Sequence, residues 1–298
     1  MTALSITRRG TLAFLLSAAA FPVAAQDRPV IATDSYPLAY FAQRLGGGDI
    51  DVLFAVPSGT DPSFWRPGIT DIAAIQGADL IALNGAGFST WPTKASLPRS
   101  RTIDTSASFE DRLIRTDTVT HSHGEGGEHS HTATANYTWL DFSLAMEQAR
   151  ALADAMIRQM PDRASRIEME REALLADLAS LDADATELGQ GAADVQMVAS
   201  HPRYQYFGAA YGLMISSVEW DAQEEPTDAQ WAALQALQAT TGAGLFIWET
   251  DPSAASRERM SALGLTNVVF PPLAMTPTDG EFLELMKASL ERLSAALK

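Results

Sequence analysis

Short apolar runs alternate with amphipathic segments along the first part of the chain. The runs at 29–35, 51–56 and 80–83 are apolar enough to form buried strands. Between them, 36–45 and 70–77 carry apolar residues at helical spacing, and glycines follow the first of these segments. Because alternating strands and helices are typical of parallel βαβ packing, this part of the chain is predicted to form an α/β lobe.

Two longer helical patterns occupy the middle of the chain. Apolar residues recur at helical spacing from Ala145 to Met160, where Pro161 ends the pattern. A second helix is expected over 163–188, before Gly189, and would extend about 39 Å. We expect this second helix to act as a rigid spine that joins two lobes.

A second series of strands and helices follows the spine. The expected strands lie at 195–199, 214–218, 244–248 and 267–270. A helix closes at 208–213, and further helices are expected at 227–239, 253–263 and 279–297. The predicted fold is therefore α/β, with two lobes of parallel sheet flanked by helices. A ligand is expected in the cleft between the lobes, at the carboxyl ends of the strands.

The first residues have the pattern of an export signal. Arg8 and Arg9 precede a short apolar run at 11–21, and small residues at 23–25 form a cleavage site. The arginine pair also resembles a twin-arginine signal, so the Tat and Sec routes both stay open. An N-terminal anchor helix is the alternative. No other apolar run is long enough to span a membrane, so we expect a soluble protein of the periplasm.

These patterns divide the chain into four parts. They are a signal peptide at 1–25, an N-terminal lobe at 26–140 with a His-rich loop at 116–135, a helical region at 141–190, and a C-terminal lobe at 191–298.

Composition narrows the chemistry that is open to the protein. The chain has 298 residues and a formal net charge of −16, which argues against binding to nucleic acid. It has no cysteine, so disulfides, thiolate metal ligands and the lipid-bearing cysteine of a lipoprotein are not expected. Metal ligands would have to come from carboxylates and the five histidines.

Four of these histidines form two His-x-His pairs in one polar loop. The pairs are His121 with His123 and His129 with His131, separated by a stretch of Gly and Glu. Neutral imidazole is a common metal ligand, and the glycines would let both pairs reach one ion. The alternative of a solvated polar loop without bound metal stays open.

A few further residues lie where a ligand would bind. His201 and Glu249 follow predicted strands, and Glu249 is interpreted either as an acceptor for a histidine N–H or as a surface acid. Asp279 is either a ligand or the N-cap of the last helix. The aromatic residues near these motifs would either wall the cleft or pack the lobes; among them are Trp65, Trp139 and Tyr204.

The order of these motifs resembles the solute-binding proteins of bacterial zinc and manganese ABC importers (cluster A-I, periplasmic zinc-binding type). The resemblance rests on Val-Pro-Ser-Gly-Thr-Asp-Pro at 56–62, Trp-Leu-Asp at 139–141, His-Pro-Arg-Tyr-Gln-Tyr-Phe at 201–207, and Asp279 before the last helix. It implies one metal ion between the lobes, typically held by three histidines and one acid.

The resemblance carries over to the site residue by residue. His201 and Asp279 match the family's ligands, whereas Ser63 and Thr138 stand where the family has histidine. Neutral hydroxyls are poor zinc ligands, so we expect the two missing ligands either from His129 and His131 of the loop or from water.

The resulting hypothesis is a periplasmic, monomeric protein that captures a divalent metal, zinc in preference to manganese, for an ABC importer permease. A metallochaperone is a further expected partner. The alternatives are a zinc chaperone or scavenger, and a receptor for a metal chelate or another small solute. An enzyme is not expected, because the chain has no Gly-x-Ser-x-Gly, His-Glu-x-x-His or phosphate-loop motif.

Overall fold

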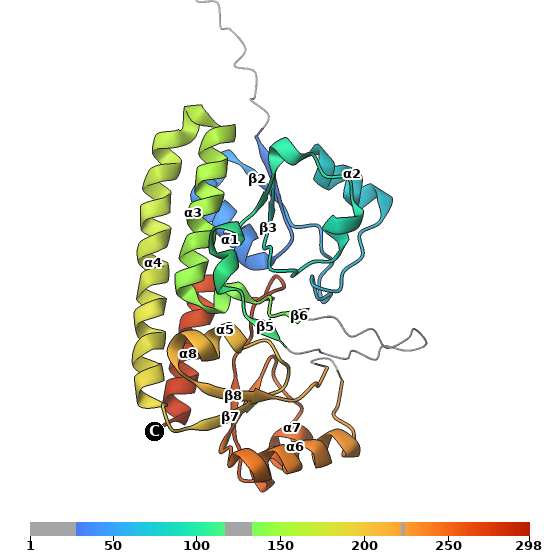
Figure 1. Ribbon diagram of the computed structural model, residues 1–298, viewed down its shortest axis with the longest axis vertical. Coiled ribbons are helices and arrows are strands. Elements are labelled where there is room, and N and C mark those ends of the chain that lie inside the picture. The colour runs from blue at the N-terminus through green and yellow to red at the C-terminus, as the bar shows by residue number, and fades with distance from the viewer. Residues whose placement is uncertain (1–27, 117–132, 222–223) are drawn as a thin grey trace, which may run out of the picture.

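The N-terminal half is built on a parallel sheet. The structure, a computed structural model, describes residues 28–116, 133–221 and 224–298 (Figure 1). The strand order is β2-β1-β3-β4, and Ile31 pairs with both Val52 and Leu80. The four strands are β1 Val30–Thr33, β2 Asp51–Leu53, β3 Leu80–Leu83 and β4 Thr102–Asp104. The predicted signal peptide and the four loop histidines lie outside the described residues.

The C-terminal half repeats this design. Its strands are also parallel, in the order β10-β9-β7-β8. Their bounds are β7 Gln196–Ala199, β8 Met214–Ser217, β9 Leu245–Trp248 and β10 Thr266–Val269. A short antiparallel pair, β5 Arg115–Thr116 and β6 Ala133–Thr134, stands apart from both sheets. The predicted α/β fold with two parallel sheets is confirmed.

Helices connect the strands and pack on the sheets. The α-helices are α1 Tyr36–Gly46, α2 Ile69–Gly77, α3 Phe142–Gln159, α4 Ala164–Gly191, α5 Gln205–Tyr211, α6 Asp228–Thr241, α7 Ala254–Ala262 and α8 Phe282–Ala296. Short 3-10 turns are η1 Gly47–Asp49, η2 Trp91–Lys94, η3 Arg99–Arg101, η4 Ala107–Arg112, η5 Thr138–Leu140 and η6 Pro161–Arg163. The predicted spine is α4, which runs along one side of both halves (Figure 1).

Local sequence signals explain where several helices begin. Asp141 accepts the backbone N–H groups of Ser143 and Leu144 at the start of α3. Thr227 and Gln230 form a capping box at the start of α6. The last helix was predicted from Asp279, and this start is wrong because α8 begins at Phe282. Gly280 has a φ of +79°, a left-handed conformation that a helix cannot include.

The largest hydrophobic core crosses from one half to the other. It contains residues of both sheets, among them Ile31 on β1 and Ile247 on β9, together with Leu178 on α4. Helix α4 contacts α1 and α3 and also α5 and α8. This shared core fixes the loops at the carboxyl ends of the two sheets opposite each other. Within the described residues, no helix has the length and apolar character needed to cross a membrane.

Candidate metal site between the two sheets

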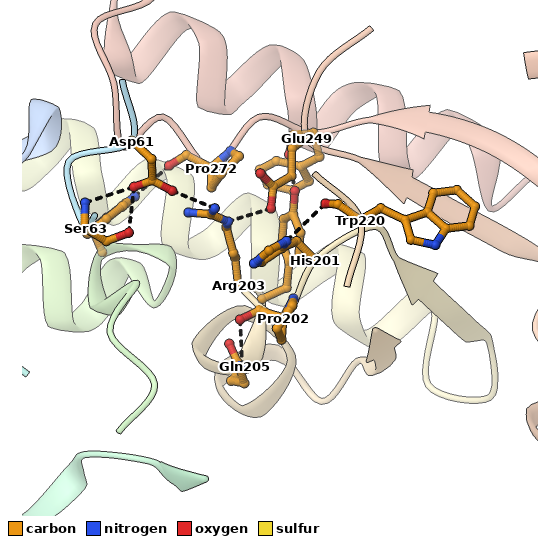
Figure 2. A network of polar contacts seen from close by, with 12 residues as sticks. Asp61, Ser63, His201, Pro202, Arg203, Gln205, Trp220, Glu249 and Pro272 are labelled. Atoms are coloured by element: carbon orange, nitrogen blue, oxygen red, sulfur yellow. Dashed lines mark hydrogen bonds and ion pairs between the residues drawn. The ribbon is translucent and has the colours of Figure 1, made fainter. Parts of the chain in front are cut away.

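His201 lies just beyond the carboxyl end of β7 and is half-buried. Its Nδ1 lies 3.1 Å from the carbonyl oxygen of Trp220 (Figure 2). A carbonyl oxygen only accepts, so Nδ1 carries the proton and donates it. In the neutral imidazole, Nε2 then keeps its lone pair and can bind a metal. Metal-binding histidines are commonly oriented in this way by a backbone carbonyl.

Ser63 is held in a tight turn after β2. Its backbone N and its hydroxyl both donate to Oδ1 of Asp61, at 2.9 and 2.6 Å. The hydroxyl proton of Ser63 is therefore used in a hydrogen bond within the N-terminal half. The turn also fixes the carboxylate of Asp61, whose other oxygen points toward the C-terminal half (Figure 2).

Arg203 bridges the two halves at this point. Its Nη2 donates to Oδ2 of Asp61 at 2.7 Å, and its Nε lies 2.7 Å from Oε1 of Glu249. Its guanidinium carbon lies 4.8 Å from the ring centre of Tyr137, which adds a cation–π contact. Figure 2 shows the guanidinium between the two carboxylates, with the imidazole of His201 nearby.

Glu249 follows β9, and its side chain is only 8% exposed. Nε of Arg203 and Oε1 of Glu249 form a buried ion pair at 2.7 Å. Among the described residues, neither Nε of Arg203 nor Oε1 of Glu249 has another hydrogen-bond partner. The surface-acid reading of Glu249 is wrong, whereas its role as an acceptor for a histidine N–H stays a prediction. Glu249 is buried, and the carbonyl of Trp220 accepts the Nδ1–H of His201.

The two carboxylates differ in their proton affinity. Burial raises the pKa of Glu249, and the charges of Arg203 and His201 oppose this rise only in part. Burial would also raise the pKa of Asp61, but the Arg203 charge and the hydrogen bonds from Ser63 hold it below its ordinary value. Asp61 is therefore the more firmly ionised partner of Arg203.

Thr138 does not face this site. It is fully buried, and its Oγ1 lies 3.2 Å from Oδ1 of Asn84 and 3.1 Å from Oε1 of Gln148. Gln148 in turn donates from Nε2 to Oδ1 of Asn84 at 3.0 Å. Thr138, a possible cleft position from the sequence, is thus part of a buried polar network with Asn84 and Gln148.

The three aromatic candidates pack the interior. Trp65 stacks edge-on against Trp91, with ring centres 6.2 Å apart. Trp139 donates from Nε1 to the carbonyl of Pro272 at 2.7 Å, and the Tyr204 hydroxyl donates to a backbone carbonyl at 2.5 Å. All three are at most 8% exposed, so they act as core residues and not as walls of a cleft.

The remaining predicted ligand lies at the surface. Asp279 is exposed and sits in a bend before α8. Its neighbour Thr278 lines a cavity of about 300 Å³ together with Phe54, Val56 and Thr60 of the N-terminal half. Asp279 therefore lies close to the junction of the halves without being buried in it.

The structure brings His201, Asp61 and Glu249 around Arg203. In the part of the chain that the structure describes, no group of three or more His, Asp or Glu side chains is arranged to hold a metal ion. Sequence reasoning missed Asp61 and Arg203. The available signal was their place inside the quoted motifs, Asp61 before Pro62 and Arg203 two residues after His201.

Comparisons with known proteins agree on one family. Residues 31–296 match the family described as zinc-uptake complex component A, periplasmic. The high-affinity zinc uptake system protein ZnuA of Bacillus subtilis is 25% identical over 293 residues, covering 91% of this chain and 88% of that protein. The zinc-binding lipoprotein AdcA of Streptococcus pneumoniae is 25% identical and covers the whole chain, which spans 61% of its length.

Solved structures share the fold. The metal-dependent lipoprotein YcdH of Bacillus subtilis has a TM-score of 0.75 at 22% identity and covers 90% of this chain and 98% of its own. FpvC of Pseudomonas aeruginosa, solved in complex with Mn²⁺, has a TM-score of 0.72 at 20% identity and covers 91% of this chain and 98% of its own.

Proposed function

The chain belongs to the family of periplasmic A components of zinc-uptake complexes, and from that premise we propose that it captures a divalent metal ion and delivers it to the permease of an ABC importer. The family role is solute binding and not catalysis. Zinc is the first candidate, because imidazole is a preferred zinc ligand and the chain resembles a zinc-binding lipoprotein and a zinc uptake protein.

The orientation of His201 carries this proposal. The backbone carbonyl of Trp220 fixes its tautomer, so that Nε2 is ready to bind a metal before the ion arrives. The further ligands of the proposal are His129 and His131, with His121 and His123 as a second pair and Asp279 as an acid at the junction. Ser63 and Thr138 are not among them, since their hydroxyls are committed to Asp61 and to the network of Asn84 and Gln148.

The proposal includes a place and partners. The protein would act in the periplasm as a monomer, because the two halves of one chain provide both sides of the site. Its main partner would be the membrane permease, and a metallochaperone would be a further partner on the supply side.

A zinc titration of the mature chain by isothermal calorimetry tests this function. His201→Ala is expected to weaken zinc binding by about tenfold or more, because it removes the oriented ligand. Thr138→Val is the matched control, because Thr138 stands where the family has a histidine ligand. This variant is expected to leave zinc affinity unchanged.

Two results would contradict the proposal. If the native chain binds no zinc, the metal function falls. If Thr138→Val weakens zinc binding as much as His201→Ala does, the assignment of ligands is wrong. A third chain lacking residues 121–131 tests the loop, and an unchanged affinity and stoichiometry would remove its histidines from the site.

A further inference from the structure

Arg203 puts a fixed positive charge where the two halves meet. It pairs with one carboxylate from each half, Asp61 at 2.7 Å and Glu249 at 2.7 Å, and its side chain is 11% exposed. A guanidinium stays protonated at any physiological pH, so this charge cannot be removed by titration. In the sequence it stands two residues after His201, the oriented ligand of the proposed site.

We propose that Arg203 is an internal cation that competes with the metal ion for the carboxylate of Glu249, and that it thereby sets the affinity of the cleft for divalent metals. This inference rests on the proposed function, because it assumes that metal binds at His201. In this proposal Glu249 is a potential metal ligand that is occupied by its ion pair with Arg203. Arg203 thereby determines the metal affinity of the cleft.

The geometry singles out Glu249 as the ligand that a metal could take. Asp61 is held by a directed hydrogen bond from Arg203 and by two more from Ser63. Among the described residues, Oε1 of Glu249 has no polar partner besides its ion pair with Arg203. A buried carboxylate held by one partner keeps lone pairs that a metal ion can bind. When the metal binds Glu249, Arg203 would lose its ion pair with Glu249 but retain its hydrogen bond to Asp61.

Charge balance gives the direction of the effect. Two carboxylates and one guanidinium leave the cluster with a net charge of about −1 when His201 is neutral. The guanidinium repels a divalent ion at Nε2 of His201. Its ion pair with Glu249 also keeps that carboxylate from binding the ion. Without the guanidinium, the same carboxylate is free, buried and close enough to His201 for their charges to interact.

The test is a mutant cycle read by zinc titration and by thermal unfolding. Arg203→Met is expected to tighten zinc binding by about tenfold or more, and the rise in Tm on adding zinc is expected to exceed that of the native chain. Arg203→Lys keeps the charge and is the matched control, with little gain. Glu249→Gln is expected to weaken zinc binding far more in the Arg203→Met chain than in the native chain.

A second neutral variant keeps the test valid if Arg203→Met fails to fold. Arg203→Gln removes the charge but keeps a polar side chain beside both carboxylates, and it is expected to show the same gain. If either neutral variant folds and binds zinc no more tightly than the native chain, the competition does not exist. If the gain persists when Glu249→Gln is added, Arg203 acts by general repulsion and the role of Glu249 is wrong.

The outcomes separate this inference from the proposed function. Native zinc binding that is lost in His201→Ala but unchanged in Arg203→Met supports the function and overturns the inference. Zinc binding only after Arg203 is neutralised supports the inference and overturns the function of the native chain. Absence of zinc binding from all these chains overturns both.

Discussion

Asp34 carries a carboxyl group into the interior of the N-terminal half. It is 2% exposed and follows β1, where its Oδ1 accepts the backbone N–H of Asn84 at 2.8 Å. Burial raises its pKa from 3.8 to about 7, and the hydrogen bond from the Asn84 backbone lowers it only in part. Near neutral pH the folded protein therefore holds a proton on Asp34 that the unfolded chain has released.

This difference predicts a dependence of stability on pH. Between about pH 4 and pH 7 the folded state binds the proton and the unfolded state does not, so the free energy of unfolding falls as pH rises through this window. From pH 5 to pH 8 the loss from Asp34 is expected to be about 2–3 kcal/mol. Urea unfolding of the native chain and Asp34→Asn at both pH values measures it. Equal pH dependence in the two chains would contradict the shifted pKa.

Single residues were predictable where their role is local. His201 is followed by Pro202 after an apolar strand, and these signals lie within a few positions of each other. Arg203 was not predictable as a bridge, because its partner Asp61 is 142 positions away and the contact depends on how the halves pack. Thr138 shows the same limit, since its hydroxyl meets Asn84 only after β3 and η5 are in place.

Helix α4 approaches α5 closely at Gly189. A Cβ at this position would lie 2.0 Å from the backbone carbonyl oxygen of Tyr211. The sequence predicts that Gly189 and Gly191 stop the helix, and α4 includes Gly189 and ends at Gly191. Gly189 is therefore needed for packing between two elements, even though glycine inside a helix costs about 1 kcal/mol relative to alanine.

A pair of substitutions tests this contact at the level of the elements. Gly189→Ala is expected to destabilise the protein by about 1–3 kcal/mol, because α4 and α5 must move apart to admit the methyl group. Gly191→Ala is the matched control, since a Cβ there meets nothing within 4 Å. It is expected to be neutral or slightly stabilising. Thermal unfolding of both variants gives the comparison, and equal midpoints would show that the close approach carries no strain.

Element types followed from the sequence better than element ends did. Strands and helices depend on the spacing of apolar residues, which is written in each segment. The ends depend on backbone geometry, as at Gly280, or on the neighbouring strand, as at β2, which stops at Leu53 instead of continuing to 56. The order of strands within each sheet was not predicted, because it is decided by long-range pairing.

The two halves share one hydrophobic core through α4. Leu178, on this helix, is fully buried in a cluster that includes Ile31 of the first sheet and Ile247 of the second. A smaller cluster lies wholly in the C-terminal half and contains Leu234 on α6, packed with Trp231. Because the large cluster spans both sheets, neither half can unfold without exposing apolar surface of the other. The whole chain is therefore expected to unfold in one cooperative step.

Substitution of Leu234 gives a direct test of this coupling. Leu234→Ala leaves a cavity in the C-terminal half and is expected to cost about 2–5 kcal/mol. Hydrogen exchange is then measured on peptides from β1 and from β9, with Leu178→Ala as the variant that perturbs the shared core itself. If the halves are one unit, both peptides lose the same protection in both variants, because their slowest exchange requires global opening. Loss of protection in β9 alone after Leu234→Ala would show that the halves unfold independently and that α4 links them without coupling their stability.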